Sequence, residues 1–75
     1  MTLDIMSSDY EGLKSIMENT KNNPALVVSI PYRQQGRRFY TLSITGNKQD
    51  ICDVAFLAGR WSKFLGINDI NLRVY

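Results

Sequence analysis

The spacing of hydrophobic residues changes several times within the 75 residues of this chain. Alternating apolar residues, typical of a strand with one buried face, give way to apolar residues at helical spacing, and the change is then reversed. The resulting order is strand, helix, strand, strand, helix, strand. This order predicts an α+β sandwich, in which two helices pack on one face of an antiparallel sheet.

The first third of the chain is predicted to form a short strand and a helix. Leu3 and Ile5 alternate with polar neighbours, as in a strand that buries one face. Ser8 and Glu11 have the spacing of a capping box, in which each side chain accepts a hydrogen bond from a free N–H at the helix start. The helix is expected to end before Pro24, because proline cannot continue it.

Residues 25–33 and 37–45 are predicted to pair as a β-hairpin. A loop of three residues, 34–36, places three apolar pairs on one face, namely Ile30 with Tyr40, Val28 with Leu42, and Leu26 with Ile44. A loop of two or four residues would pair apolar with polar side chains, so the pattern favours three. Gly36 would then take the left-handed conformation that such a loop requires.

The last third is predicted to form a second helix and a final strand. Asn47 can cap the helix with Asp50 at its third position, and Gly66 can end it. A strand with alternating apolar residues follows. The side chains expected in the core are Leu13, Met17, Val28, Ile30, Leu42, Ile44, Val54, Ala58, Trp61, Leu65, Leu72 and Val74.

The βαββαβ order is that of a ferredoxin-like sandwich, for which two right-handed crossovers give the spatial strand order 4-1-3-2. The chain length fits one compact domain over residues 1–75. If residues 2–6 do not form a strand, an αββαβ domain with three strands is the alternative.

The composition argues against catalysis. The chain has no histidine, which is the commonest general base and a common metal ligand. Its single cysteine, Cys52, has no histidine to activate it and is expected to be a small, partly buried apolar residue. We therefore expect no catalytic residues, no metal and no cofactor. A lone cysteine and the absence of a leader or a long apolar run lead us to expect a cytoplasmic protein without a membrane segment.

The net charge of +2 is distributed unevenly, because no acidic residue lies between Glu18 and Asp50. Arginine and aromatic residues gather at the tip of the predicted hairpin. There, Arg33 and Arg37 are expected to face each other on the side of the sheet without helices, together with Pro31, Val27 and Phe39. The residues predicted to bind a partner are Tyr32, Arg33, Gln35, Arg37, Arg38 and Phe39, with Arg60 and Lys63 on the second helix.

These features predict a non-enzymatic binding protein, an accessory regulator or inhibitor that docks on a macromolecular protein partner or a nucleoprotein complex. The analogy is with small phage- and plasmid-encoded proteins that act on host nucleic-acid machinery. The alternative is a nucleic-acid-binding module whose hairpin arginines contact phosphates. RNA-recognition domains share the strand order, but they stack bases on sheet aromatics where this chain has Asp4 and Thr41. A homodimer through a free sheet edge is a further alternative.

Overall fold

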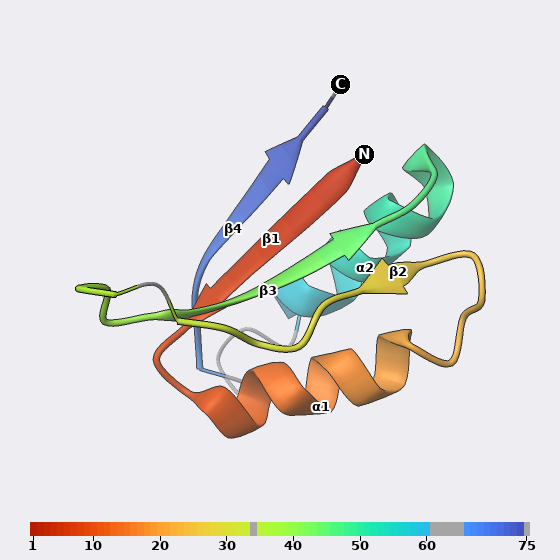
Figure 1. The fold of residues 1–75 in the computed structure, drawn as a ribbon. Helices are drawn as coiled ribbons and strands as arrows, with labels where there is room; N and C mark the ends of the chain where they lie inside the picture. The colour runs from red at the N-terminus through yellow and green to blue at the C-terminus, as the bar shows by residue number, and fades with distance from the viewer. Residues whose placement is uncertain (34, 61–65, 75) are drawn as a thin grey trace.

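The computed structural model describes residues 1–33, 35–60 and 66–74 (Figure 1). Within these residues the chain is an α+β fold with two helices and one four-stranded antiparallel sheet. The elements in chain order are β1 (Thr2–Ser7), α1 (Tyr10–Thr20), β2 (Val27–Val28), β3 (Tyr40–Thr45), α2 (Lys48–Arg60) and β4 (Ile67–Arg73). The α+β prediction is therefore confirmed.

The strands lie in the order β2-β3-β1-β4, which is 4-1-3-2 when read from the other edge. The central strand is β1, which pairs with β3 on one side and with β4 on the other. Its Ile5 lies opposite Leu42 of β3 and Ile70 of β4. Because β1 is a full strand in the middle of the sheet, the three-stranded alternative is wrong.

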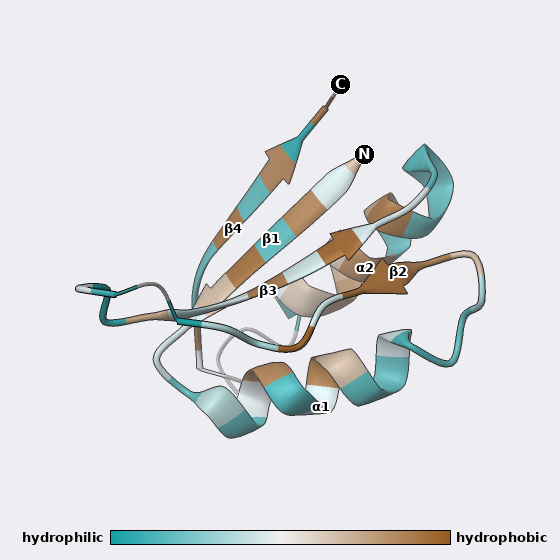
Figure 2. Cartoon of the chain, in the orientation of Figure 1, coloured by the Kyte–Doolittle hydropathy of each residue, from teal (hydrophilic) through white to brown (hydrophobic). Residues whose placement is uncertain are grey.

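Both helices pack on the same face of the sheet (Figure 1). Every second residue of β1 and β3 points toward them. Of these residues Leu3, Ile5, Ser7, Leu42 and Ile44 are almost completely buried and Tyr40 is partly buried, and Figure 2 shows the resulting alternation of polar and apolar residues along both strands. The buried hydrophobic side chains form one cluster of Leu3, Ile5, Leu13, Ile16, Leu26, Leu42, Ile44, Ile51, Val54 and Ala58. Met17 and Val28, also predicted in the core, are partly buried against this cluster.

The first helix begins one residue later than predicted. Its cap is Asp9, whose Oδ1 accepts a hydrogen bond from the Glu11 N–H at 3.1 Å. The cap moves because strand β1 extends to Ser7. The Ser7 hydroxyl accepts a hydrogen bond from the Asp9 N–H at 2.9 Å, at the start of the helix. Ser8 instead donates its N–H to Asn68 Oδ1 at 2.9 Å. The capping box at Ser8 is therefore wrong.

The predicted cap of the second helix is confirmed. Asn47 Oδ1 accepts from the Asp50 N–H at 2.9 Å, and Asn47 Nδ2 donates to the Asp50 carboxylate at 2.8 Å. Gly66 has the predicted left-handed backbone, with φ of 65°. The segment between Arg60 and Gly66, including the predicted core residues Trp61 and Leu65, lies outside the described residues.

The predicted hairpin register is wrong. Val28 pairs with Ile44, and the next bridge joins Tyr32 to Thr41. Three residues, 29–31, lie between these bridges on the side of β2, but only two, 42–43, lie between them on β3. The segment after β2 therefore contains one extra residue. Proline lacks the N–H that a regular ladder needs and is found at such irregularities. The extra residue turns Ile30 outward, where it is 73% exposed, and buries Pro31, which was expected on the outer face.

Two further core predictions fail on β4. Leu72 is 48% exposed and Val74 is 70% exposed. Leu72 lies on the edge strand β4 and Val74 just beyond its end, whereas Leu3, which lies opposite Leu72 on the central strand β1, is buried. No helix among the described residues has the length and apolar character needed to cross a membrane.

Candidate functional site on the open face of the sheet

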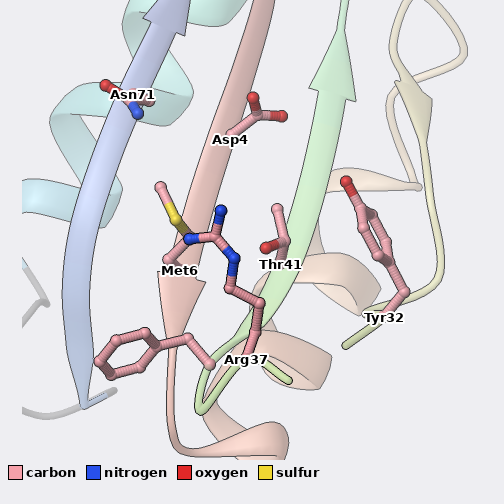
Figure 3. A pocket seen from close by; sticks show the side chains of 7 residues that line it. Asp4, Met6, Tyr32, Arg37, Thr41 and Asn71 are labelled. Atoms are coloured by element: carbon pink, nitrogen blue, oxygen red, sulfur yellow. The ribbon is translucent and has the colours of Figure 1, made fainter. Parts of the chain in front are cut away.

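The face of the sheet opposite the helices carries a hollow of about 260 Å³ (Figure 3). Its lining comes from three strands and from the segment that joins β2 to β3. The lining residues are Asp4, Met6, Tyr32, Arg37, Phe39, Thr41 and Asn71. The hollow therefore combines two aromatic rings and a thioether with a carboxylate, a guanidinium group and two neutral polar groups.

The carboxylate of Asp4 is already satisfied within the chain. It receives a 2.7 Å hydrogen bond from the Ser43 hydroxyl and forms an ion pair with Arg73, whose Nε lies 2.8 Å from Oδ2. The Asp4 side chain is only 16% exposed. The Tyr32 hydroxyl lies 3.5 Å from the Ser43 hydroxyl, which extends the network toward the rim. This network makes the middle of the open face polar and fixes its side chains.

The guanidinium group of Arg37 is in a different situation. In Figure 3 its side chain runs from the hairpin segment across the sheet toward β1. Among the described residues it has no ion-pair or hydrogen-bond partner. A guanidinium group is permanently charged and can hold a carboxylate through two parallel hydrogen bonds. Arg37 is therefore the group of the hollow that remains available for an acidic ligand.

The structure separates Arg33 from Arg37, so the prediction that they face each other is wrong. The Arg33 guanidinium lies over the ring of Tyr40, 5.7 Å from its centroid, and that ring also packs edge-on against Tyr10 of α1 at 5.1 Å. Tyr40 packs against the core, on the side of the helices, as predicted. The extra residue before Tyr32 shifts the pairing, and Arg33 thus leaves the open face.

The other predicted binding residues are divided between several places. Tyr32 and Phe39 line the hollow and are 42% and 40% exposed. Gln35 and Arg38 are exposed in the segment between β2 and β3. Arg60 is exposed at the end of α2, in the layer of helices, and Lys63 lies outside the described residues.

The sequence predicted Asp4 of β1 on the open face, but not that Met6 and Asn71 line a hollow together with it. Asp4, Met6 and Asn71 line the hollow, but they are far from the hairpin in the sequence. The alternation of β1 showed that Asp4 and Met6 share a face. Their position beside the hairpin depends on the pairing of β1 with β3, in which Met6 lies opposite Thr41. The expected order 4-1-3-2 makes β1 and β3 neighbours, but local patterns carry no information on the register between them.

No group of three or more histidine, cysteine, aspartate or glutamate side chains is placed to hold a metal ion in residues 1–33, 35–60 and 66–74. Cys52 is a free thiol and is exposed, so its expected partial burial is wrong. Its position early in α2 leaves it on the opposite side of the sheet from the hollow.

Comparison with known proteins adds no functional information. No protein-family model matches the chain, and no curated protein matches it. The geometry of the open face therefore has to support any functional conclusion.

Proposed function

We propose that this chain is a non-enzymatic binding protein that docks on a protein partner through the open face of its sheet. The observation that carries the proposal is Arg37, which has no ion-pair or hydrogen-bond partner among the described residues and lies beside two half-exposed aromatic rings on the face opposite α1 and α2. Arginine and aromatic residues supply most of the binding energy at protein interfaces. The partner would place an acidic side chain against Arg37 and an apolar one against Phe39 and Tyr32.

The charges of the open face favour a protein partner over nucleic acid. Asp4 lines the hollow, and Asp69 belongs to the same face because it lies opposite Met6 in the pairing of β1 with β4. These two carboxylates balance the guanidinium groups of Arg37 and Arg73. Nucleic-acid affinity comes largely from cations that neutralise phosphates, and a face of mixed sign gives little of that attraction. We therefore keep the nucleic-acid-binding module as the alternative, carried by Arg37 and Arg38.

We also assign the architecture to the ferredoxin-like sandwiches. The βαββαβ order, the strand order 4-1-3-2 and the placement of both helices on one face support this assignment. In this arrangement the open face is the broad surface of the sheet that remains for a partner. A small chain that binds without catalysis can act as an accessory regulator or inhibitor by covering a surface of its target.

The test compares two arginines of the same segment. A partner is captured from lysate after nuclease treatment, and its affinity is measured for the wild type, Arg37→Ala and the control Arg33→Ala. Loss of an interface arginine costs about 2 kcal/mol at a hot spot, which is about a thirtyfold weaker affinity. We expect that loss for Arg37→Ala and a much smaller one for Arg33→Ala, because Arg33 lies against Tyr40 on the side of the helices.

Two results would contradict the proposal. Equal binding by Arg37→Ala and the wild type would show that the hollow is not the docking site. Capture that disappears with nuclease, together with a steep salt dependence, would support the nucleic-acid alternative. Two phosphate contacts on duplex DNA, from Arg37 and Arg38, give a slope of about −1.8 in log affinity against log salt, whereas protein docking depends less on salt.

A further inference from the structure

The two edges of the sheet differ in how they could receive another strand. The edge strand β2 has two residues, whereas β4 has seven, Ile67–Arg73. Within the described residues no strand pairs with the outer edge of β4. Its apolar residue Leu72 is 48% exposed, and Val74 just beyond the strand is 70% exposed. An edge of this length with exposed apolar side chains is a template for strand addition.

The hydrogen bonds of β4 show which backbone groups face outward. The Ile70 N–H donates to the carboxylate of the preceding residue, Asp69, at 2.9 Å and not to a strand. In an antiparallel ladder the residues point their N–H and C=O groups alternately to one side and to the other. Ile70 and Leu72 therefore present their backbone groups at the free edge, while Asn71 between them faces β1.

The side chains of β4 are complementary to a second, antiparallel copy of the same strand. If Asn71 lies on the two-fold axis, Ile70 of one copy pairs with Leu72 of the other, and both of these residues have outward-facing backbone groups. The same register places Asp69 opposite Arg73 of the second copy on the open face. In this register the outward-facing backbone groups of both copies form the hydrogen bonds of an antiparallel ladder. Apolar side chains are paired on the side of the helices, and opposite charges are paired on the open face.

We propose that two copies of this chain pair through β4 in that register and form a continuous eight-stranded sheet. In the single chain the Ile70 N–H donates its hydrogen bond to the Asp69 carboxylate. In the dimer this N–H donates to the Leu72 carbonyl of the second copy instead. The Asp69 carboxylate is then free to meet Arg73 of that copy. Arg73 can make both contacts, because it uses Nε and Nη2 for Asp4 and retains Nη1.

The first test measures molar mass against concentration for the wild type, Asp69→Arg, Arg73→Asp and the control Glu18→Arg on α1. Each edge variant places two like charges opposite each other twice in the dimer, and we expect its dimerisation to weaken about tenfold or more. Mixing the two edge variants restores opposite charges at both positions, so the mixture should form a heterodimer. Glu18→Arg makes the same change of charge as Asp69→Arg and should dimerise like the wild type.

The second test fixes the register and does not depend on the folding of Arg73→Asp. Asn71 of one copy lies opposite Asn71 of the other in a pair without hydrogen bonds, where Cα atoms are about 4.5 Å apart, within the range of a disulfide. In a Cys52→Ser background, Asn71→Cys should give a covalent dimer on mild oxidation, and the exposed control Gln49→Cys should not. A wild type that stays monomeric at millimolar concentration would overturn the proposal. So would a dimer that is unaffected by Asp69→Arg and not cross-linked at position 71.

Discussion

The two faces of the sheet are made by the same strands but are built in different ways. The face under the helices is formed by alternate residues such as Ile5 and Leu42, which are completely buried. The open face is formed by the residues between them, such as the polar Asp4 and the apolar Met6, which are partly exposed. Burial of apolar side chains stabilises the first face. Hydrogen bonds and the ion pair between Asp4 and Arg73 fix the side chains of the second face.

This difference sets what a substitution on each face should do. A side chain of the covered face contributes the free energy of its removal from water, which is about 1.5–3 kcal/mol for a large aliphatic residue. A side chain of the open face contributes less to folding, because water competes for its contacts. It remains available for a partner. The covered face should therefore dominate stability, and the open face should dominate binding.

The largest effect is expected from Leu42→Ala. Leu42 of β3 is completely buried in the core, and removing its side chain should lower the free energy of unfolding by about 2–5 kcal/mol. For a domain of 75 residues, that is a large part of the total stability. Denaturant unfolding followed by circular dichroism measures it. Thr41→Ala, one position away on the open face, is the matched control and should cost far less; equal losses would remove the distinction between the faces.

Much of the covered face could be predicted from the sequence, because it depends on local periodicity. The alternation in β1, the helical spacing in α1 and α2 and the cap at Asn47 are all properties of neighbouring residues. The failures at Leu72 and Val74 have another cause. Alternation shows which side chains share a face, but it does not show whether a helix reaches far enough to cover them.

The open face could be predicted only in part, because its site depends on register between distant segments. The hairpin arginines and Phe39 were visible as a local cluster. The position of Arg37 in a hollow beside Asp4 and Asn71 needed the pairing of three strands. One extra residue near Pro31 was enough to move Arg33 to the opposite side. A site assembled across strands is therefore more sensitive to small register errors than a core is.

An intermediate effect is expected from Asp4→Asn. The substitution keeps the shape of the side chain but removes its charge, so the ion pair with Arg73 is lost while a hydrogen bond from Ser43 can remain. Because Arg73 is 57% exposed, the pair is partly screened, and we expect a loss of about 1 kcal/mol. In an Arg73→Gln background the same substitution should cost clearly less. If the loss is the same in both backgrounds, Asp4 does not act through Arg73.

The smallest effect is expected from Ile30→Ala, which tests the register that divides the faces. With a three-residue loop, Ile30 would pack opposite Tyr40 in the core, and its truncation would cost about 2–5 kcal/mol. In the structure Ile30 is 73% exposed, because the extra residue before Tyr32 turns it to solvent. Truncation of an exposed side chain should change the free energy of unfolding by no more than about 0.5 kcal/mol.

The measurement is again denaturant unfolding, with Val28→Ala as the matched control. Val28 lies two residues earlier, pairs with Ile44 and packs partly against the core, so its truncation should cost more than that of Ile30. If truncation of Ile30 lowered the free energy of unfolding more than truncation of Val28, the simple alternating register would be correct. Arg33 and Arg37 would then return to a common face, and the separation on which the binding test relies would no longer hold. A small loss at Ile30 with a larger one at Val28 supports the irregular pairing that separates Arg37 in the hollow from Arg33 on the other side of the sheet.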